Sequence, residues 1–400
     1  MKKTLTLVMA LLLTLALVLT GCGGNANGGA TPEPVTPTDS GTDPAPVETG
    51  DDDVIKVGIF EPLTGANAAG GQMELEGIKV AHSLVGEVLG KKIVLVEMDN
   101  KSDDVEAVTA AERLVNSEKV DIVVGSWGSS VCIAAGDTFM NAKVPAIGTS
   151  CTNPLVTLDN PYYFRVCYLD DFQGTLLANF AKQEGYKTAA VITDVSDTYA
   201  IGLKKYFVDA FGAENIVAEA QFNKGDQDFT AQITSVMAAN PEVIFAPSGY
   251  AEAGLMMKQA ADLGYNILFL GADTWETEVM FEVGGVATEN CRFTTFFDAD
   301  AAPTPESTQF LTAYEAMFGG KPKGAVTALG YDAYMVAIAA IEKAGTTDGE
   351  ALQKALTELD VTGVTGRCVF DENGDAVKNQ AIIKTVQDGG FKYISTVVVD

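Results

Sequence analysis

Apolar and polar positions along the chain follow two alternating patterns. Short, nearly continuous apolar runs, such as 54–60 and 120–125, predict buried strands. The segments between these runs, such as 72–88, repeat apolar residues at helical spacing. Continuous apolar strands separated by amphipathic helices are typical of parallel sheets that are covered by helices on both faces.

The alternation occurs twice. The first series predicts strands at 54–60, 92–98, 120–125, 144–148 and 162–166, and helices at 72–88, 105–117 and 129–141. The second series begins after Asp170 and predicts helices at 172–184, 199–211, 229–240 and 252–263, and strands at 188–193, 215–220, 242–246 and 267–270. Two such series predict an α/β protein with two doubly wound, Rossmann-like lobes.

The end of the chain departs from this pattern. It predicts helices at 304–318, 326–344 and 348–359, followed by strands at 367–371, 380–386 and 391–399. The turns at 371–374 and 388–390 contain Asn-Gly and Gly-Gly, which are hairpin signals. If the helices complete the first lobe and the strands the second, the lobes comprise 54–167 with 297–363 and 168–296 with 364–400. A multi-strand hinge would then cross at 165–169, 292–297 and 361–367.

The N-terminus predicts export. Lys2 and Lys3 precede an apolar run at 5–19, and Leu19-Thr20-Gly21-Cys22 resembles a bacterial lipobox. We therefore expect a signal peptide at 1–21 and a lipid on Cys22, although a plain signal peptide is an alternative. Residues 22–53 are rich in Pro, Gly and acids and contain no Lys or Arg, which predicts a disordered linker. The protein would be anchored to the outer face of the bacterial cell membrane.

The net charge and the amino-acid composition argue against several functions. A net charge of −28 opposes binding to nucleic acid or to anionic membrane surfaces. The sequence has one histidine, and its six cysteines form no Cys-x-x-Cys pair. These residues are a poor ligand set for zinc, so no metal is expected. Cys132 with Cys151 and Cys291 with Cys368 are possible disulfides, but Cys167 is a further candidate and the connectivity stays open.

Catalytic motifs are also missing. In the loop Gly125-Ser126-Trp127-Gly128, a tryptophan stands where a nucleophile elbow requires its serine. The only histidine, His82, is spaced with the apolar residues of a helix. The sequence contains neither a phosphate-binding loop nor a dinucleotide fingerprint after the first strand. We therefore expect neither an enzyme nor a cofactor, and an extracellular hydrolase is a disfavoured alternative.

The predicted strand ends carry candidate ligand groups. Ligands of open parallel sheets bind beyond the carboxyl ends of the strands. Ser129 and Thr152 follow neighbouring strands, and their hydroxyl and amide groups could bind one carboxylate. Asp273 ends a strand of the other lobe and could accept an ammonium, and Tyr199 and Tyr250 could cover the space between. A carboxylate site that faces a cation site predicts an α-amino acid ligand.

Several short motifs carry a resemblance to a known family. Residues 54–400 resemble the branched-chain amino acid-binding proteins of ABC importers, which have the type I periplasmic binding fold. The motifs are Ile55-Lys56-Val57-Gly58, Pro62-Leu63-Thr64-Gly65, Val123-Val124-Gly125 with Ser129-Ser130, Pro145-Ala146-Ile147 to Thr152, Phe164-Arg165-Val166, Asp171-Phe172-Gln173-Gly174, Tyr199-Ala200-Ile201-Gly202 and Gly330-Tyr331-Asp332-Ala333.

The resemblance implies roles for individual residues. Ser129 and Thr152 would bind the ligand carboxylate together with backbone groups at Ser150. Asp273 would meet the ammonium, where the family often has Glu, and Tyr199 would close over the ligand. The side-chain pocket would be lined by Tyr250 and walled by Trp127. Family members often carry an aromatic residue near the position of Gly70, and its absence leaves the ligand preference open.

The resemblance also implies a biological role. The protein would be an extracytoplasmic lipoprotein of an ABC importer that binds an amino acid between its lobes as a monomer. Closure of the lobes would present the ligand to membrane permease subunits. One alternative is a sensory lipoprotein that reports an amino acid or a similar small carboxylate to a receptor. Another is a binder of an amide or an aromatic acid.

Overall fold

The computed structural model describes residues 54–301 and 304–398. The expected signal peptide at 1–21, the lipidated Cys22 and the linker at 22–53 lie outside the described residues. Within the described ranges, no helix has the length and apolar character that crossing a membrane requires.

The first sheet has the strand order β2-β3-β1-β4-β5-β6. All its neighbouring strands are parallel except the short β2, which runs antiparallel to β3. Strands β1, β4, β5 and β6 are mostly buried because helices cover both faces, whereas β3 is largely exposed or half-buried. The strands are β1 (Val54–Glu61), β2 (Glu87–Val88), β3 (Lys91–Asp99), β4 (Ile122–Val124), β5 (Ala146–Gly148) and β6 (Tyr163–Arg165).

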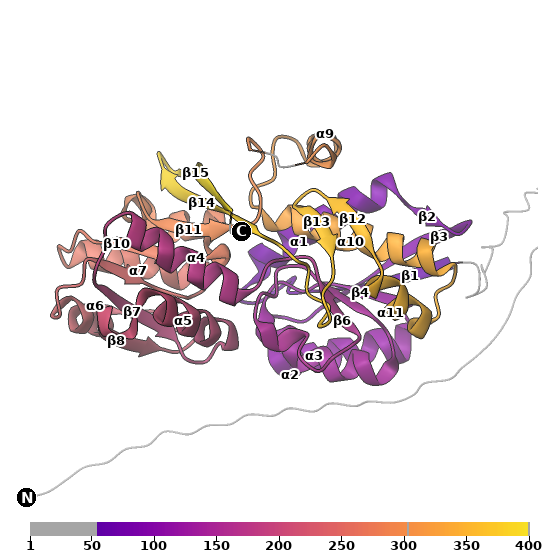
Figure 1. The fold of residues 1–400 in the computed structure, drawn as a ribbon, viewed down its shortest axis with the longest axis horizontal. Helices are drawn as coiled ribbons and strands as arrows, with labels where there is room; N and C mark the ends of the chain where they lie inside the picture. The colour runs from indigo at the N-terminus through magenta and orange to yellow at the C-terminus, as the bar shows by residue number, and fades with distance from the viewer. Residues whose placement is uncertain (1–53, 302–303, 399–400) are drawn as a thin grey trace, which may run out of the picture. The chain divides into compact units, whose positions relative to one another are not determined.

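Two pairs of helices cover the first sheet, as Figure 1 shows. One pair is α1 (Ala68–Leu84) with α10 (Val326–Ala344), which pack along each other, and α11 (Gly349–Thr357) lies beside α10. The other pair is α2 (Asp104–Glu112) with α3 (Ser129–Ala142). Because α10 comes late in the chain, residues far apart in sequence complete this lobe.

The second sheet has the order β15-β14-β11-β10-β9-β7-β8. Strands β7 (Ala189–Asp194), β8 (Ile216–Phe222), β9 (Val243–Phe245), β10 (Leu268–Gly271) and β11 (Arg292–Thr295) are parallel. Strands β14 (Gln380–Gln387) and β15 (Gly390–Val398) extend it as an antiparallel hairpin. The helices of this lobe are α4 (Asp170–Gln183), α5 (Thr198–Phe211), α6 (Thr230–Met237), α7 (Tyr250–Asp262) and α8 (Glu278–Gly284).

The remaining elements are short or connect the sheets. Helix α9 (Glu306–Phe318) packs against α1 of the first lobe, and β12 (Asp360–Gly363) pairs with β13 (Gly366–Val369) in a separate sheet. A π-helical turn follows α2 and four 3₁₀ turns lie in loops: η2 (Arg113–Glu118), η3 (Pro154–Val156), η4 (Ala213–Asn215), η5 (Asp273–Trp275) and η6 (Gly285–Thr288).

The predicted fold class is confirmed, with two sheet lobes in an α/β arrangement. One predicted pairing is wrong, because β13 pairs with β12 and not with β14. The chain does turn at 371–374, but the two segments that flank the turn pair only through one isolated bridge, between Phe370 and Ala376. The hairpin at 388–390 is confirmed by the pairing of β14 with β15. The lobe boundaries stay a prediction.

The five described cysteines are all free, so neither possible disulfide forms. Cys291 precedes β11 of the second sheet, whereas Cys368 lies in β13 of the separate two-stranded sheet. Cys132, Cys151 and Cys167 lie close enough for their side chains to hydrogen bond as thiols. All five side chains are buried.

Candidate ligand-binding site

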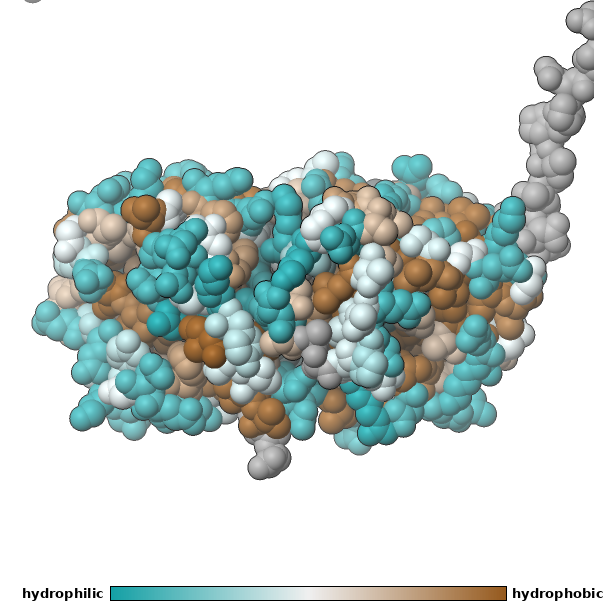
Figure 2. All heavy atoms as spheres, turned by 90° about the horizontal axis from the view of Figure 1, so that it is seen from above, coloured by the Kyte–Doolittle hydropathy of each residue, from teal (hydrophilic) through white to brown (hydrophobic). Residues whose placement is uncertain are grey.

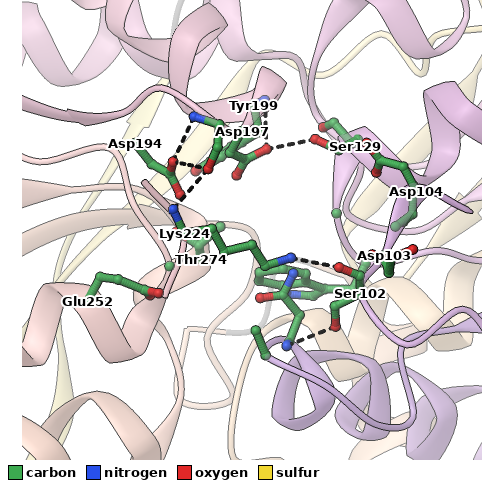
Figure 3. Close-up of a pocket in the computed structure, with 18 of the residues that line it drawn as sticks. Ser102, Asp103, Asp104, Ser129, Asp194, Asp197, Tyr199, Lys224, Glu252 and Thr274 are labelled. Atoms are coloured by element: carbon green, nitrogen blue, oxygen red, sulfur yellow. Dashed lines mark hydrogen bonds between the residues drawn. The ribbon is translucent and has the colours of Figure 1, made fainter. Parts of the chain in front are cut away.

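A cavity of about 370 Å³ opens at the carboxyl ends of strands from both sheets. This volume falls in the range of small-molecule sites, about 300–1,000 Å³. As Figure 3 shows, residues from loops of the two lobes face one another across it. The first lobe contributes Ser102, Asp103, Asp104, Trp127, Ser129 and Ser150. The second contributes Asp194, Asp197, Tyr199, Lys224, Glu252 and Thr274.

The start of α3 forms one part of the wall. Gly128 precedes the helix with a φ of +97°, a conformation that favours glycine. No side chain caps this helix, so its first-turn N–H groups keep their capacity to donate. Ser129, Ser130 and Val131 of the first turn line the cavity. A helix N-terminus carries partial positive charge and attracts an anion, which makes this part of the wall suited to a carboxylate.

Ser129 and Thr152 lie in contacting loops. The Ser129 hydroxyl accepts the N–H of Asn153, the residue after Thr152, at 3.1 Å. Ser129 lines the cavity, whereas Thr152 is fully buried beside it. Among the described residues the Thr152 hydroxyl makes no hydrogen bond of ordinary geometry, although the Asp170 carboxyl group lies near it. A buried hydroxyl without a partner is uncommon, and a ligand group could satisfy it.

Ser150 also lines the cavity, but its hydroxyl is already used. It donates to the buried carboxyl group of Glu74, which also accepts the Thr149 hydroxyl at 2.6 Å. Only the main chain of Ser150 is therefore left for a ligand. This agrees with the backbone role that the family resemblance implies.

Asp273 lies behind Tyr199 and not in the cavity wall. Its Oδ1 accepts the Tyr199 hydroxyl at 2.9 Å and the side-chain amide of Gln173 at 2.8 Å. The same amide donates to Asp170 at 2.7 Å, so Gln173 bridges two buried carboxyl groups. Burial raises the pKa of Asp273 to about 6. Burial, together with the charge of Asp273, raises the pKa of Asp170 to about 8.

Asp170 and Asp273 have no ion-pair partner among the described residues. A second carboxylate near a buried one disfavours ionisation, and a cation at this place would relieve the repulsion. An ammonium group that reached Tyr199 would lie next to this negative charge. Asp170 and Gln173 were missed as site residues in the sequence, because their contacts with Asp273 join segments far apart in the chain.

Trp127 fills the space that Gly70 leaves open. A Cβ added to Gly70 would lie 2.5 Å from the indole Nε1, so any side chain there would displace the ring. The other side of the indole meets the Tyr250 ring edge-on, with centroids 6.2 Å apart. Trp127 lines the cavity and Tyr250 supports it from behind. The sequence hypothesis that Trp127 takes the volume of a missing aromatic residue agrees with this packing.

Several hydrogen bonds join the lobes around the cavity. Ser130 donates to Asp197 at 2.8 Å, and the Tyr250 hydroxyl donates to the carbonyl oxygen of Ala66 at 2.7 Å. The ammonium of Lys224 donates to the carbonyl oxygen of Ser102 at 2.6 Å, and Figure 3 shows this side chain reaching across the cavity. These bonds hold the two lobes together at the cavity.

The predicted residues thus fall into two groups. Trp127, Ser129, Ser150 and Tyr199 form the wall, and Thr152, Tyr250 and Asp273 stand directly behind it. Lys224 was missed because β8 was expected to end at 220. The strand continues to Phe222, which places Lys224 in the loop at its carboxyl end.

The described residues contain no group of three or more His, Cys, Asp or Glu side chains that could hold a metal ion. A second cavity, of about 320 Å³, lies within the second lobe and is lined by residues at 266–269 and 289–292. On the face shown in Figure 2, hydrophobic residues appear in separate groups among hydrophilic ones.

Comparisons with known proteins agree with this geometry. A family model described as periplasmic binding protein matches residues 54–390. The leucine-, isoleucine-, valine-, threonine- and alanine-binding protein of Pseudomonas aeruginosa is 31% identical over 333 residues, which is 81% of this chain and 87% of that protein.

Two solved structures are also similar. The leucine-binding protein LivK of Thermotoga maritima has 36% identity and a TM-score of 0.83, covering 86% of this chain and 99% of that one. The substrate-binding protein LivJ of the branched-chain amino acid transporter of Streptococcus pneumoniae, solved with isoleucine, has 30% identity and a TM-score of 0.81 at the same coverage.

Proposed function

Because the chain belongs to the periplasmic binding protein family, a family of solute-binding proteins and not of enzymes, we propose that it binds an amino acid for an ABC importer. The ligand is a branched-chain amino acid or a related one, held in the cavity between the lobes. The protein then delivers it to the permease subunits in the membrane. The names of the similar proteins, which bind leucine, isoleucine or valine, support this ligand class.

The arrangement of the cavity carries the proposal. An uncapped helix start with Ser129 lies in the first lobe, and the uncompensated carboxyl groups of Asp170 and Asp273 lie behind Tyr199 in the second. An α-amino acid has a carboxylate and an ammonium that match these two charges. In the proposed complex, Ser129, Thr152 and the Ser150 main chain bind the carboxylate, and Tyr199 with Asp273 binds the ammonium.

We infer the location of the protein from the sequence of its N-terminus. The expected lipid on Cys22 and the acidic linker at 22–53 would keep a monomeric binding unit near the permease at the outer face of the membrane. A sensory lipoprotein would use the same cavity. A permease and an ATPase encoded beside this chain would favour transport, and a receptor kinase would favour sensing.

Calorimetry with two site variants tests the proposal. A thermal-shift screen of the mature protein against the standard amino acids first identifies the tightest ligand, because a ligand that binds the folded state raises its melting temperature. Ser129→Ala and Asp273→Asn should then weaken binding, and Asp273→Asn should do so by roughly thirtyfold, since removing a buried charge partner costs about 2 kcal/mol or more.

Exposed residues of the same types provide matched controls. Ser117→Ala and Asp262→Asn lie on the surface away from the cavity and should keep the wild-type affinity. If no amino acid raises the melting temperature, the proposed function is wrong. If Asp273→Asn binds as tightly as the wild type, the ammonium assignment is wrong and the carboxylate site is judged by Ser129→Ala alone.

A further inference from the structure

Two buried carboxyl groups lie behind the cavity wall of the first lobe. Glu61 is the last residue of β1 and Glu74 lies in α1, and both side chains are fully buried. Their carboxyl groups lie close enough to hydrogen bond to each other if one of them carries a proton. Neither takes part in an ion pair within the described part of the chain. The binding roles proposed above do not use them.

Each carboxyl group is bonded to a different loop of the cavity wall. Oε2 of Glu61 accepts the main-chain N–H of Trp127 at 2.9 Å. The two oxygens of Glu74 accept the hydroxyls of Thr149 and Ser150. The pair therefore connects the loop after β4 to the loop after β5, and these two loops supply Trp127, Ser129 and Ser150 to the cavity.

The hydrogen bonds place a proton on Glu61. Its second oxygen, Oε1, receives no donor from any described residue. The contact with Glu74 can be a hydrogen bond only if one of the two carboxyl groups carries a proton. Both oxygens of Glu74 already accept hydroxyls, so the free Oε1 of Glu61 is the place for it. Glu61 then donates to Glu74 while it accepts from Trp127.

We propose that Glu61 and Glu74 form a proton-sharing pair that positions the Trp127 and Ser150 loops, so that ligand binding requires the shared proton. This inference rests on the proposed function of the cavity. When the proton is lost, two negative charges face each other with no cation between them. Buried like charges repel strongly and need solvation, which the pair can obtain only if the two loops separate. The cavity wall is then disordered, and negative charge also accumulates behind the ligand carboxylate.

The pKa values agree with the proton assignment. Burial raises the pKa of Glu61 well above its usual value, and the charge of Glu74 adds to the rise. Burial also raises the pKa of Glu74 to about 8, although its hydrogen bonds oppose this. The pair therefore keeps a proton at pH 7 and loses it at higher pH. Affinity should be highest while the pair keeps its proton and should fall when that proton is lost at higher pH.

Other titratable groups lie near the pair. Cys151, in the loop after β5, acts on both carboxyl groups. The cation of Arg165 on β6 is committed to Asp375 at 2.5 Å and to two carbonyl oxygens, so it does not neutralise the pair. The remaining groups are Cys132 on α3 and Tyr163 on β6, whose pKa values burial raises, and Tyr331 and Asp332 on α10, which packs on α1.

Glu61→Gln is the decisive variant. Its amide can donate to Glu74 through nitrogen and accept from Trp127 through oxygen, so it reproduces both bonds without a titrating proton. At pH 7 this variant should bind L-leucine, or the amino acid with the largest thermal shift, within about twofold of the wild type. Between pH 7 and pH 9 the wild-type affinity should fall about tenfold for each pH unit above the pKa of the pair, whereas the variant should stay flat.

Cys151→Ala separates the pair from the neighbouring thiol. This variant should keep the wild-type pH transition, because it leaves both carboxyl groups in place. The ligand ammonium also titrates at high pH, and it affects the affinity of every variant equally. Comparing the pH dependence of the wild type with that of Glu61→Gln therefore cancels this contribution. If Cys151→Ala abolishes the transition while Glu61→Gln keeps it, the thiol is responsible and the proposal is overturned.

A measurement on the ligand-free protein tests the carboxyl pair even if the proposed function is wrong. The Glu61 side chain bonds the main chain of Trp127, so loss of the proton at higher pH should change the tryptophan fluorescence of the free protein. Trp127→Phe and Glu61→Gln should both remove this transition. If no amino acid binds, the proposed function fails and the fluorescence titration still decides on the pair. If the fluorescence and the affinity of the wild type are both independent of pH, the pair does not act as proposed.

Discussion

Trp127 shows how one side chain can determine the shape of a ligand site. The indole lies over Gly70 on one side and against the Tyr250 ring on the other, and its remaining surface lines the cavity. Its main-chain N–H is held by Glu61. Contacts on these sides restrict the ring, so the wall that a ligand side chain meets is rigid.

Trp127→Ala should therefore change which ligand is preferred more than it changes carboxylate binding. Removing the indole enlarges the cavity beside the ligand side chain, so the affinity for phenylalanine should rise relative to that for leucine by roughly tenfold, the effect of one or two methylene groups. Calorimetry with both amino acids measures this ratio. Trp127→Phe retains an aromatic ring against Tyr250 and serves as the control, with a smaller change. An unchanged ratio in Trp127→Ala would place the indole outside the ligand's reach.

At the scale of elements, β14 brings a buried cation into the second lobe. The ammonium of Lys384 lies 2.5 Å from Glu276 and 3.0 Å from Asp298, and all three side chains are largely buried. Glu276 follows η5 and Asp298 follows β11, so this contact joins the C-terminal hairpin to the segment that leaves the second sheet. Asp273 belongs to η5, which links this network to the proposed ammonium site.

Lys384→Met should lower the free energy of unfolding by about 3 kcal/mol, because it leaves two buried carboxylates without a cation. Denaturant titration measures the loss. Lys392→Met, on the exposed side of β15, is the matched control and should change stability by less than about 0.5 kcal/mol. Equal stability of the two variants would show that the buried network contributes little.

The elements also show which local patterns are informative. Helix α10 begins and ends where its apolar spacing predicts, at Val326 and Ala344. Strands β2, β11 and β12 were not predicted as strands, because none of them contains a continuous apolar run. The pairing of β13 was also wrong, since an Asn-Gly turn determines where a chain reverses but not how far the two arms stay paired.

At the scale of the whole molecule, several carboxyl groups keep protons when the chain folds. Burial raises the pKa of Glu74 and of Asp170 to about 8, and that of Asp273 to about 6. Between the ordinary carboxyl pKa, near 4, and these values the folded state binds more protons than the unfolded state. The free energy of unfolding must then decrease as the pH rises through this window.

The melting temperature of the ligand-free protein should accordingly be higher at pH 5 than at pH 8. Repulsion among the surface acids of a chain with a net charge of −28 acts in the same direction. Asp170→Asn separates buried protonation from surface repulsion, because it removes one buried titrating group. The melting temperature of this variant should therefore depend less on pH than that of the wild type. Asp262→Asn on the surface should leave it unchanged. A melting temperature that rises steadily from pH 5 to pH 8 contradicts the proposed proton uptake.

The sequence by itself determined the fold class, the two lobes and the loops that could hold a ligand. Those features depend on periodicity within short segments and on the general rule for strand ends, and both can be read locally. Ser129 and Tyr199 were predicted for this reason, as residues that come a few positions after the end of a strand.

Only the tertiary structure decided which predicted residues reach the cavity and which stand behind it. Asp273 turns to Tyr199 and Gln173, Trp127 fills the space above Gly70, and Glu61 meets Glu74. Each of these contacts depends on side-chain direction and on the packing of separate elements. Burial, which sets the charge state of the buried acids, likewise arises only when the lobes are assembled.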